Sequence, residues 1–272
     1  MEIRNIAVVL DIEAIDPDLV ALASDLARRH HATLVGVAAA EPPVMLMGLD
    51  GGDVAGALYA EQRSQIEASL AGARQNFAAL VPSGVKHQWA EAVQRPDVAI
   101  VSLARTVDLI IVGSPVKESG IGQAIDIGAV LLGSGRPVLI AASGQRKLKA
   151  SKIVIAWKDT KEARRAVADG LPLLKAADDV SVVVVDEGNL ATERASMLDA
   201  VAWLRSHEVN AHGDVLPDNG GVAQTVIQAA TTTGADLVVS GAYGHSRLRE
   251  WLLGGMTRDL LTAPGISRLL SN

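Results

Sequence analysis

Four glycines near the end of the chain have a spacing that could form an anion-binding loop. Two residues separate Gly241 from Gly244, and nine residues separate Gly244 from the pair Gly254 and Gly255. The loop follows an apolar run at 235–239 that predicts a buried strand, and a helical pattern comes after it. Glycines let the backbone approach a phosphate, and a helix N-terminus supplies free N–H groups and partial positive charge. The pattern therefore predicts a phosphate site, although its spacing is neither a dinucleotide fingerprint nor a P-loop.

Polar side chains inside this loop could contribute to the same site. His245 and Arg247 would either contact a phosphate or form the solvated start of the following helix. Tyr243 would stack on a base or, in the interpretation that we favour, cover the loop.

Charged residues follow two strands that are expected beside the loop. Lys158 follows an apolar run at 153–157, and Asp186 and Glu187 follow another at 180–185. Because the carboxyl ends of parallel strands meet at one edge of a sheet, we expect these residues near the glycines. The two carboxylates could hold a metal, repel a triphosphate or, as we favour, pair with Lys158.

Other catalytic and metal-binding classes have no sequence support. The chain has no cysteine, and its six histidines form neither an HxH nor an HExxH pair. A Gly-x-Ser-x-Gly nucleophile elbow is also absent from the sequence. The sequence therefore predicts no resident metal and no catalytic residue.

The glycine spacing resembles the nucleotide motif of the universal stress protein family, in which Gly-x2-Gly-x9-Gly is followed by Ser or Thr. Gly241, Gly244 and Gly254 match this motif, and Gly255 stands at the Ser or Thr position. The resemblance implies that these glycines lie against the ribose and phosphates of ATP. It also implies an Asp after the first strand that bonds adenine, and in the second half Lys158 occupies that position. A lysine only donates hydrogen bonds, so it cannot replace a carboxylate acceptor.

The first half of the chain shows the opposite set of matches to this family. Asp11 stands at the position of the adenine-binding Asp and would mark a vestigial adenine site. Gly113 matches the first glycine, but Val116 replaces the second, and Asp126 and Ile127 fall where the last pair would be. We therefore expect any nucleotide site to be confined to the second half.

The chain as a whole predicts a duplicated α/β domain. Short Val- and Ile-rich runs alternate with helical patterns, which is typical of parallel βαβ units. The run at 107–113 is similar to the run at 235–241, and a basic, turn-like segment at 144–151 separates the halves. We predict domains at 1–146 and 147–272, each a Rossmann-like, five-stranded parallel sheet flanked by helices. The resemblance places them in the adenine nucleotide alpha hydrolase-like fold.

The individual elements follow from this alternation. Strands are predicted at 6–10, 33–37, 85–89, 109–112, 138–140, 153–157, 180–185, 209–215 and 237–239. Helices are predicted at 18–30, 57–80, 96–105, 123–132, 161–174, 192–207, 221–232 and 256–261. A Met-rich segment at 42–56 is expected to be irregular, and it could be a flexible loop, an apolar lid or a partner site.

Composition limits the classes of partner. The formal net charge is −6 with no basic run, which disfavours nucleic acid and anionic membranes as partners. No leader precedes the first strand and no apolar run reaches the roughly 18–20 residues of a membrane span, so we expect a cytoplasmic protein.

The favoured function is that of a stress-response protein that acts by binding. An adenine nucleotide such as ATP is the expected ligand, and the two domains are expected to pair as a pseudo-dimer within the chain. A homodimer and unidentified protein partners are further expectations. The alternatives are a nucleotide-free interaction module and a weak ATPase or nucleotidyl-transfer enzyme that uses Asp186 and Glu187.

Overall fold

The structure is a computed structural model that describes residues 2–43, 52–114, 125–186, 188, 190–242, 259–260 and 265–272. Its first half contains β1 (Asn5–Val9), α1 (Pro17–Arg29), β2 (Thr33–Ala40), α2 (Gly52–Leu80), β3 (His87–Val93), α3 (Pro96–Leu103), β4 (Leu109–Gly113), α4 (Ile127–Ser134) and β5 (Val138–Ala141). Its second half contains β6 (Lys152–Ala156), α5 (Lys161–Leu174), β7 (Asp179–Asp186), α6 (Leu190–Ser206), β8 (Ala211–Pro217), α7 (Val222–Thr233), β9 (Leu237–Gly241) and β10 (Ser267–Ser271).

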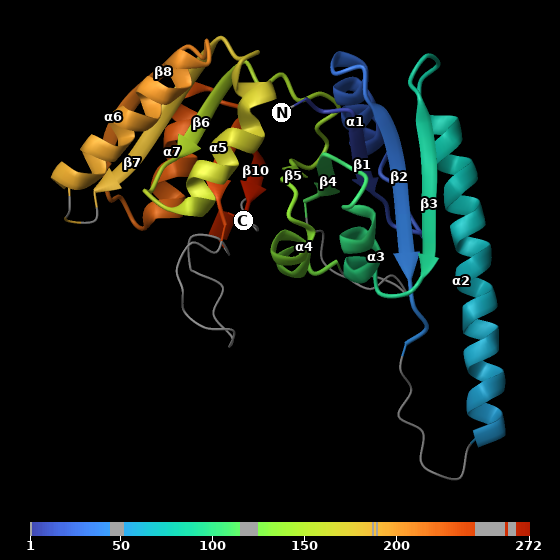
Figure 1. Cartoon of the computed structure of the whole chain (residues 1–272). Coiled ribbons are helices and arrows are strands. Elements are labelled where there is room, and N and C mark those ends of the chain that lie inside the picture. The colour runs from blue at the N-terminus through green and yellow to red at the C-terminus, as the bar shows by residue number, and fades with distance from the viewer. Residues whose placement is uncertain are drawn as a thin grey trace.

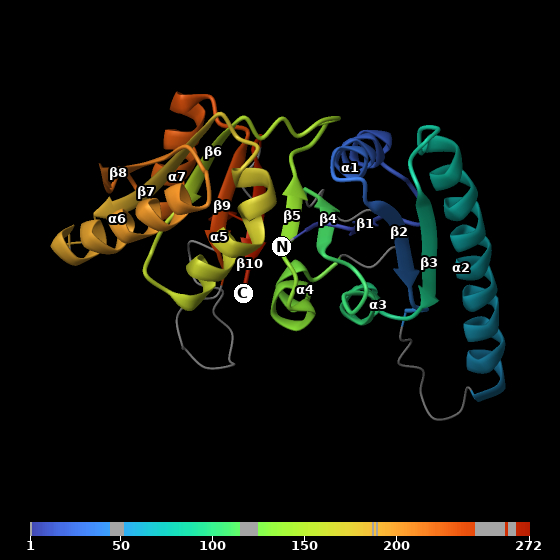
Figure 2. The ribbon, with the colours of Figure 1, turned by 45° about the horizontal axis from the view of Figure 1, so that its top comes forward.

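All ten of these strands belong to one continuous sheet (Figures 1 and 2). Their order is β3-β2-β1-β4-β5-β10-β9-β6-β7-β8. From the outer edge to the centre of the sheet, the strands of both halves therefore follow the order third, second, first, fourth, fifth. Strands within each half pair in parallel, and β5 pairs with β10 in antiparallel fashion. The predicted α/β class, with a five-stranded parallel sheet in each half, is confirmed.

Helices cover both faces of the sheet, and this explains the apolar runs of the central strands. On β1, Ile6 and Val8 join the core under α1, α2, α5 and α6, whereas Ala7 and Val9 join the core under α3, α4 and α7. A strand that is buried on both faces shows no polar alternation in its sequence. The central strands were therefore predictable as short apolar runs.

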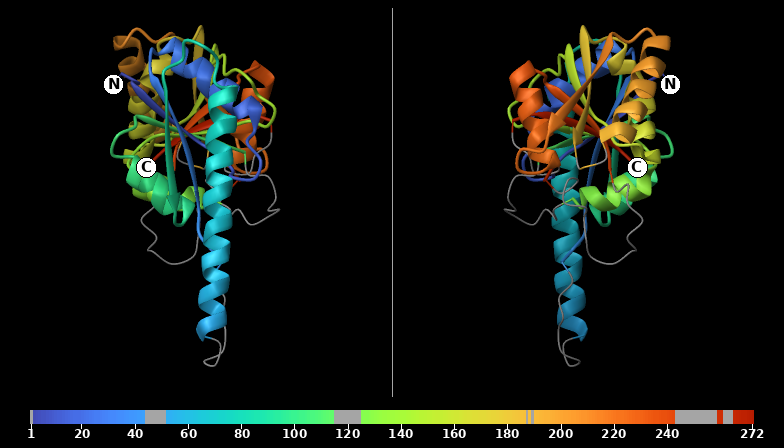
Figure 3. Two further views of the ribbon diagram at one scale, coloured as in Figure 1. Left: turned by 90° about the vertical axis from the view of Figure 1, so that its right-hand side faces the viewer. Right: turned by 90° about the vertical axis from the view of Figure 1, so that its left-hand side faces the viewer.

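Helix α2 begins earlier than expected and extends past the sheet (Figure 3). The predicted irregular segment at 42–56 overlaps its first turn, because the helix begins at Gly52 rather than residue 57. Ile66, Leu70 and Phe77 are buried against the sheet, whereas most residues of 56–65 are exposed. The apolar stripe that anchors the helix thus covers only its second half, and residues 44–51 lie outside the described part of the chain.

The segment between the halves is packed rather than fully solvated. Leu148 is completely buried, and the Arg29 side chain donates a hydrogen bond to its carbonyl oxygen. Ala150 adopts a left-handed conformation and donates its N–H to Asp236 at 3.0 Å. The segment 144–151 therefore connects the halves while its own side chains and backbone bind both of them.

The sequence did not predict the last strand. β10 contains Ser267, Arg268 and Ser271, which do not resemble the Val- and Ile-rich runs of the other strands. It is nevertheless at most 1% exposed at every residue, because it lies between β5 and β9. The predicted helix at 256–261 falls outside the described residues except for 259–260, which are helical.

Candidate functional site

The second half of the sheet has a switch point between β6 and β9. The chain proceeds from β6 to β7 and β8 on one side and later adds β9 and β10 on the other. Gly241 and Asp186 end β9 and β7, and Lys158 lies two residues after β6. Because these three strands are adjacent and parallel, the structure places all three residues at one edge of the sheet, where α/β proteins commonly bind ligands.

Gly241 lies directly against the first turn of α5. A Cβ atom added to Gly241 would be 2.5 Å from the backbone nitrogen of Ala163 and 2.6 Å from the carbonyl carbon of Glu162. These are backbone atoms, so they cannot move aside as a flexible side chain would. Close helix–strand packing thus accounts for a glycine at this position.

The N-terminus of α5 is capped from within the chain. The Thr160 hydroxyl accepts a hydrogen bond from the backbone N–H of Ala163 at 3.1 Å. In the same turn Glu162 is 4% exposed, and its carboxylate lies 3.4 Å from the Lys161 ammonium. A buried carboxylate at the positive end of a helix dipole is favourable, and it adds negative charge to the helix N-terminus whose backbone contacts Gly241. Sequence reasoning missed Glu162, whose only signal was an acidic residue in the first helical turn.

Lys158 and Asp186 stand on either side of a well-anchored strand end. The Trp157 N–H donates to the Val183 carbonyl at 2.8 Å, and its indole N–H donates to the Ser196 hydroxyl at 3.2 Å. The Lys158 carbonyl accepts from the Thr160 N–H at 2.7 Å, which shapes the loop into α5. The Asp186 carboxylate accepts from the Gly188 N–H at 2.8 Å. The proposed ion pair between Lys158 and an acidic neighbour stays a prediction, and Glu187 lies outside the described residues.

Most of the glycine loop lies outside the described residues as well. This applies to Tyr243, Gly244, His245, Arg247, Gly254 and Gly255. Their roles at a phosphate therefore remain predictions from spacing and resemblance. Of the loop positions predicted to bind nucleotide, Gly241 is the one that the structure describes.

The corresponding edge of the first half is formed by a separate set of strands. β5 and β10, where the two halves meet, run in opposite directions. Asp11 follows β1, and the strands β4, β5 and β10 lie between β1 and β9 in the sheet. The Asp11 carboxylate accepts from the Glu13 N–H at 2.8 Å. Among the described residues, Asp11 and Gly241 therefore belong to different parts of the sheet.

Charged side chains that sequence reasoning did not select gather at this first-half edge. Arg95 forms two hydrogen bonds with Asp97, of 3.1 and 2.7 Å, where α3 begins. These bonds raise the pKa of the Arg95 guanidinium above its usual value, and the charges of Asp97, Glu41 and Asp126 act in the same direction. Asp126 is the N-cap of α4 and accepts from the Ala129 N–H at 2.9 Å. The position aligned with a family glycine is thus used to begin a helix.

The described residues contain neither a metal-binding cluster nor a membrane-spanning helix. Within the described ranges, no group of three or more His, Cys, Asp or Glu side chains is arranged to hold a metal ion. No helix in those ranges is long and apolar enough to cross a membrane.

A family model connects this architecture to known proteins. Residues 2–134 match the model of the universal stress protein family. The first half of the chain therefore belongs to the universal stress protein family. No curated protein matches this chain.

Solved structures extend the similarity to the second half. A universal stress protein from Archaeoglobus fulgidus DSM 4304 has a TM-score of 0.68 and 14% identity, and the match covers 98% of this chain and 96% of that one. A protein from Pseudomonas aeruginosa PAO1 has a TM-score of 0.61 and 16% identity, with 99% and 92% covered. At these identities the likeness concerns the fold, and it shows that both halves of this chain share an architecture seen elsewhere over nearly the same length.

Proposed function

We propose that this chain is a two-domain universal stress protein that acts by binding an adenine nucleotide in its second domain. The domains would comprise residues 1–146 and 147–272 and would pair as a pseudo-dimer through β5 and β10. The main support is the placement of Lys158, Asp186 and Gly241 at the carboxyl ends of three adjacent parallel strands, around the switch point. Any protein partner or homodimer would add to this pairing, and a cytoplasmic location suits a chain without cysteine.

In this proposal the loop after β9 surrounds the phosphates. Gly241, Gly244, Gly254 and Gly255 would let the backbone approach the ligand, while His245 and Arg247 would donate to phosphate oxygens. Lys158 suits the same ligand, because an ammonium group donates to phosphate oxygens but cannot accept from the adenine amino group.

The second candidate is a nucleotide-free interaction module, and one observation favours it. Packing against α5 already explains why residue 241 is a glycine, and the buried carboxylate of Glu162 adds negative charge at the same helix N-terminus. A polyphosphate near that helix would be opposed by this carboxylate.

Mass spectrometry of small molecules released from denatured, freshly purified protein distinguishes the two candidates. Stoichiometric ATP or AMP supports the nucleotide site. Absence of nucleotide, together with no thermal shift on adding ATP, AMP or cAMP, supports the interaction module. Metal-dependent phosphate release from ATP that is lost in Asp186→Ala would instead identify an enzyme.

The position of the site is tested by replacing Gly254 and Gly255 with Val together. We expect the double variant to lose ATP binding in calorimetric titration, because the added side chains would occupy the space of the phosphates. The matched control replaces Gly56 and Gly72 with Val, since a Cβ at either position on α2 meets no atom within 4 Å. Unchanged affinity in the first variant would contradict this placement.

A further inference from the structure

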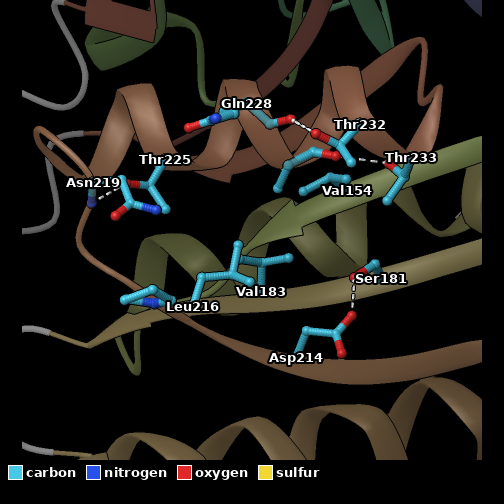
Figure 4. A pocket seen from close by; sticks show the side chains of 12 residues that line it. Val154, Ser181, Val183, Asp214, Leu216, Asn219, Thr225, Gln228, Thr232 and Thr233 are labelled. Atoms are coloured by element: carbon cyan, nitrogen blue, oxygen red, sulfur yellow. Dashed lines mark hydrogen bonds between the residues drawn. The ribbon is translucent and has the colours of Figure 1, made fainter.

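A cavity lies on the face of the second-half sheet that α7 covers (Figure 4). Its volume is about 250 Å³, and its walls come from β6, β7, β8, α7 and the turn that precedes α7. Neither Lys158 nor Gly241 lines it, so it is distinct from the edge of the sheet to which we assign the nucleotide.

The cavity exists because α7 follows the central strands rather than the outer one. Helix α7 packs mainly on β6, β7 and β9, while β8 is the outermost strand of the sheet. A twisted sheet turns its edge strand away from a helix that is aligned with its centre. Towards β8 the helix presents Thr225, Ala229 and Thr232, whose short side chains leave the space unfilled.

One end of the cavity offers hydrogen-bond acceptors. The Asp214 carboxylate accepts from the Ser181 hydroxyl at 3.0 Å through Oδ2, and His212 Nε2 lies 3.4 Å from the same oxygen. Among the described residues, no hydrogen bond or ion pair uses the other oxygen, Oδ1. Ser181 is 5% exposed and has committed its proton to Asp214, so its oxygen too can only accept.

Two threonines of α7 at this end also have hydroxyl protons that are already used in hydrogen bonds. The Thr232 hydroxyl donates to the Gln228 carbonyl at 2.8 Å, and the Thr233 hydroxyl donates to the Ala229 carbonyl at 2.9 Å. Figure 4 shows both threonines on the helix across from Ser181 and Asp214. Both threonines line the cavity, and because their protons are used within the helix, their oxygens can act only as acceptors. A ligand donor at this end would therefore find acceptors on Asp214, Ser181, Thr232 and Thr233.

The middle of the cavity is apolar. Val154 and Val183 form its floor, and Leu216 lies beside them (Figure 4). An apolar body that covers these side chains would gain roughly 25 cal/mol per Å² of apolar surface removed from water. The volume lies just below the roughly 300–1,000 Å³ of pockets for drug-sized ligands, which indicates a smaller molecule.

We propose that this cavity binds a small organic cation in which a primary ammonium group is attached to an apolar body. The ammonium group has three donors and no acceptor, which matches an end formed by Asp214 and three hydroxyl oxygens that only accept. The Asp214 carboxylate supplies the opposite charge, and Val154, Val183 and Leu216 hold the body. This site does not depend on nucleotide binding at the edge of the sheet.

Three probes that share a phenyl ring and differ in their head group test whether the site selects an ammonium group. The full chain is titrated calorimetrically with 2-phenylethylammonium, 2-phenylethanol and phenylacetate, in the absence of nucleotide. A charge-assisted hydrogen bond to Asp214 predicts that the ammonium binds about ten- to a hundredfold more tightly than the alcohol. Phenylacetate is expected not to bind. Equal affinity for all three probes, or no binding of the ammonium, would overturn the proposal.

Variants then locate the bound probe. Asp214→Asn should weaken 2-phenylethylammonium about tenfold or more, whereas Asp199→Asn, on the exposed surface of α6, removes the same charge elsewhere and should change nothing. Asp214 is half-exposed, so its replacement is not expected to disturb folding. Ala229→Met should fill the cavity and abolish binding while the unfolding temperature is kept. Retained binding in both Asp214→Asn and Ala229→Met would place the probe elsewhere and refute the assignment.

Discussion

Among single residues, Asp126 illustrates how the local structure determines what a side chain does. Its carboxylate accepts from the Ala129 N–H at 2.9 Å and so satisfies one of the free donors at the start of α4. In the family spacing this is the position of a glycine that approaches phosphate. Here the side chain begins a helix whose buried residues Val130 and Leu131 pack under the sheet.

Replacement of Asp126 measures this role. We expect Asp126→Ala to lower the free energy of unfolding by about 1 kcal/mol, because the cap is lost. Asp126→Ser, which can still accept from the Ala129 N–H, should retain most of the stability. Urea denaturation followed by circular dichroism gives both values. Equal stability of the Ala and Ser variants would show that the cap contributes nothing.

At the level of elements, the two halves differ in how closely a helix approaches the glycine that ends a strand. Beside Gly241 the nearest atoms to an added Cβ belong to the backbone of α5, at 2.5 and 2.6 Å. Beside Gly113 the nearest atom is the Leu19 side chain of α1, at an ordinary contact distance of 3.6 Å. The same sequence position in the repeat thus has a strict size limit in one half only.

The pair of substitutions Gly241→Ala and Gly113→Ala tests this difference. Gly241→Ala should lower the free energy of unfolding by about 1–3 kcal/mol, because α5 must shift away from β9. Gly113→Ala should lie within about 0.5 kcal/mol of the parent protein. Chemical denaturation with a constant m-value supplies the comparison. If the two variants lost the same stability, close packing on α5 would not explain Gly241.

At the scale of the whole molecule, the pairing of β5 with β10 joins the two halves into one sheet. Every residue of β5 is at most 2% exposed, and every residue of β10 is at most 1% exposed. The Ser267 hydroxyl accepts from the Ala142 N–H at 3.1 Å and donates to Gln145, which ties the second half to the first. Separation of the halves would expose two buried strands with unpaired backbone groups.

The halves should therefore unfold together. We expect circular dichroism and tryptophan fluorescence to report one coincident thermal transition, with equal calorimetric and van't Hoff enthalpies. Ser267→Pro, which removes a backbone donor from a central strand, should lower the unfolding temperature and separate the two signals. Two transitions in the unaltered protein would show that the junction does not couple its halves.

A large part of this architecture was predictable from the sequence, because local patterns encode it. Strands such as β1 and β9 are buried on both faces, so they appear as apolar runs between helical patterns. The repeated run before Gly113 and Gly241 indicated the duplication, and the ends of these strands indicated where Asp11, Lys158 and Gly241 would lie. These predictions required only periodicity within each segment and the rule that ligands bind at strand ends.

Contacts between segments that are far apart in the sequence determine the features that could not be predicted. Arg268 is fully buried in β10, although arginine is a residue type that is seldom fully buried. This burial lowers the pKa of its guanidinium to about 10. The antiparallel junction, the approach of α5 to Gly241 and the cavity beneath α7 likewise depend on how elements far apart in the chain pack together. Sequence periodicity determines which face of an element is apolar. Only the tertiary structure decides which partner covers that face and what space is left between them, because packing depends on the shapes of both surfaces.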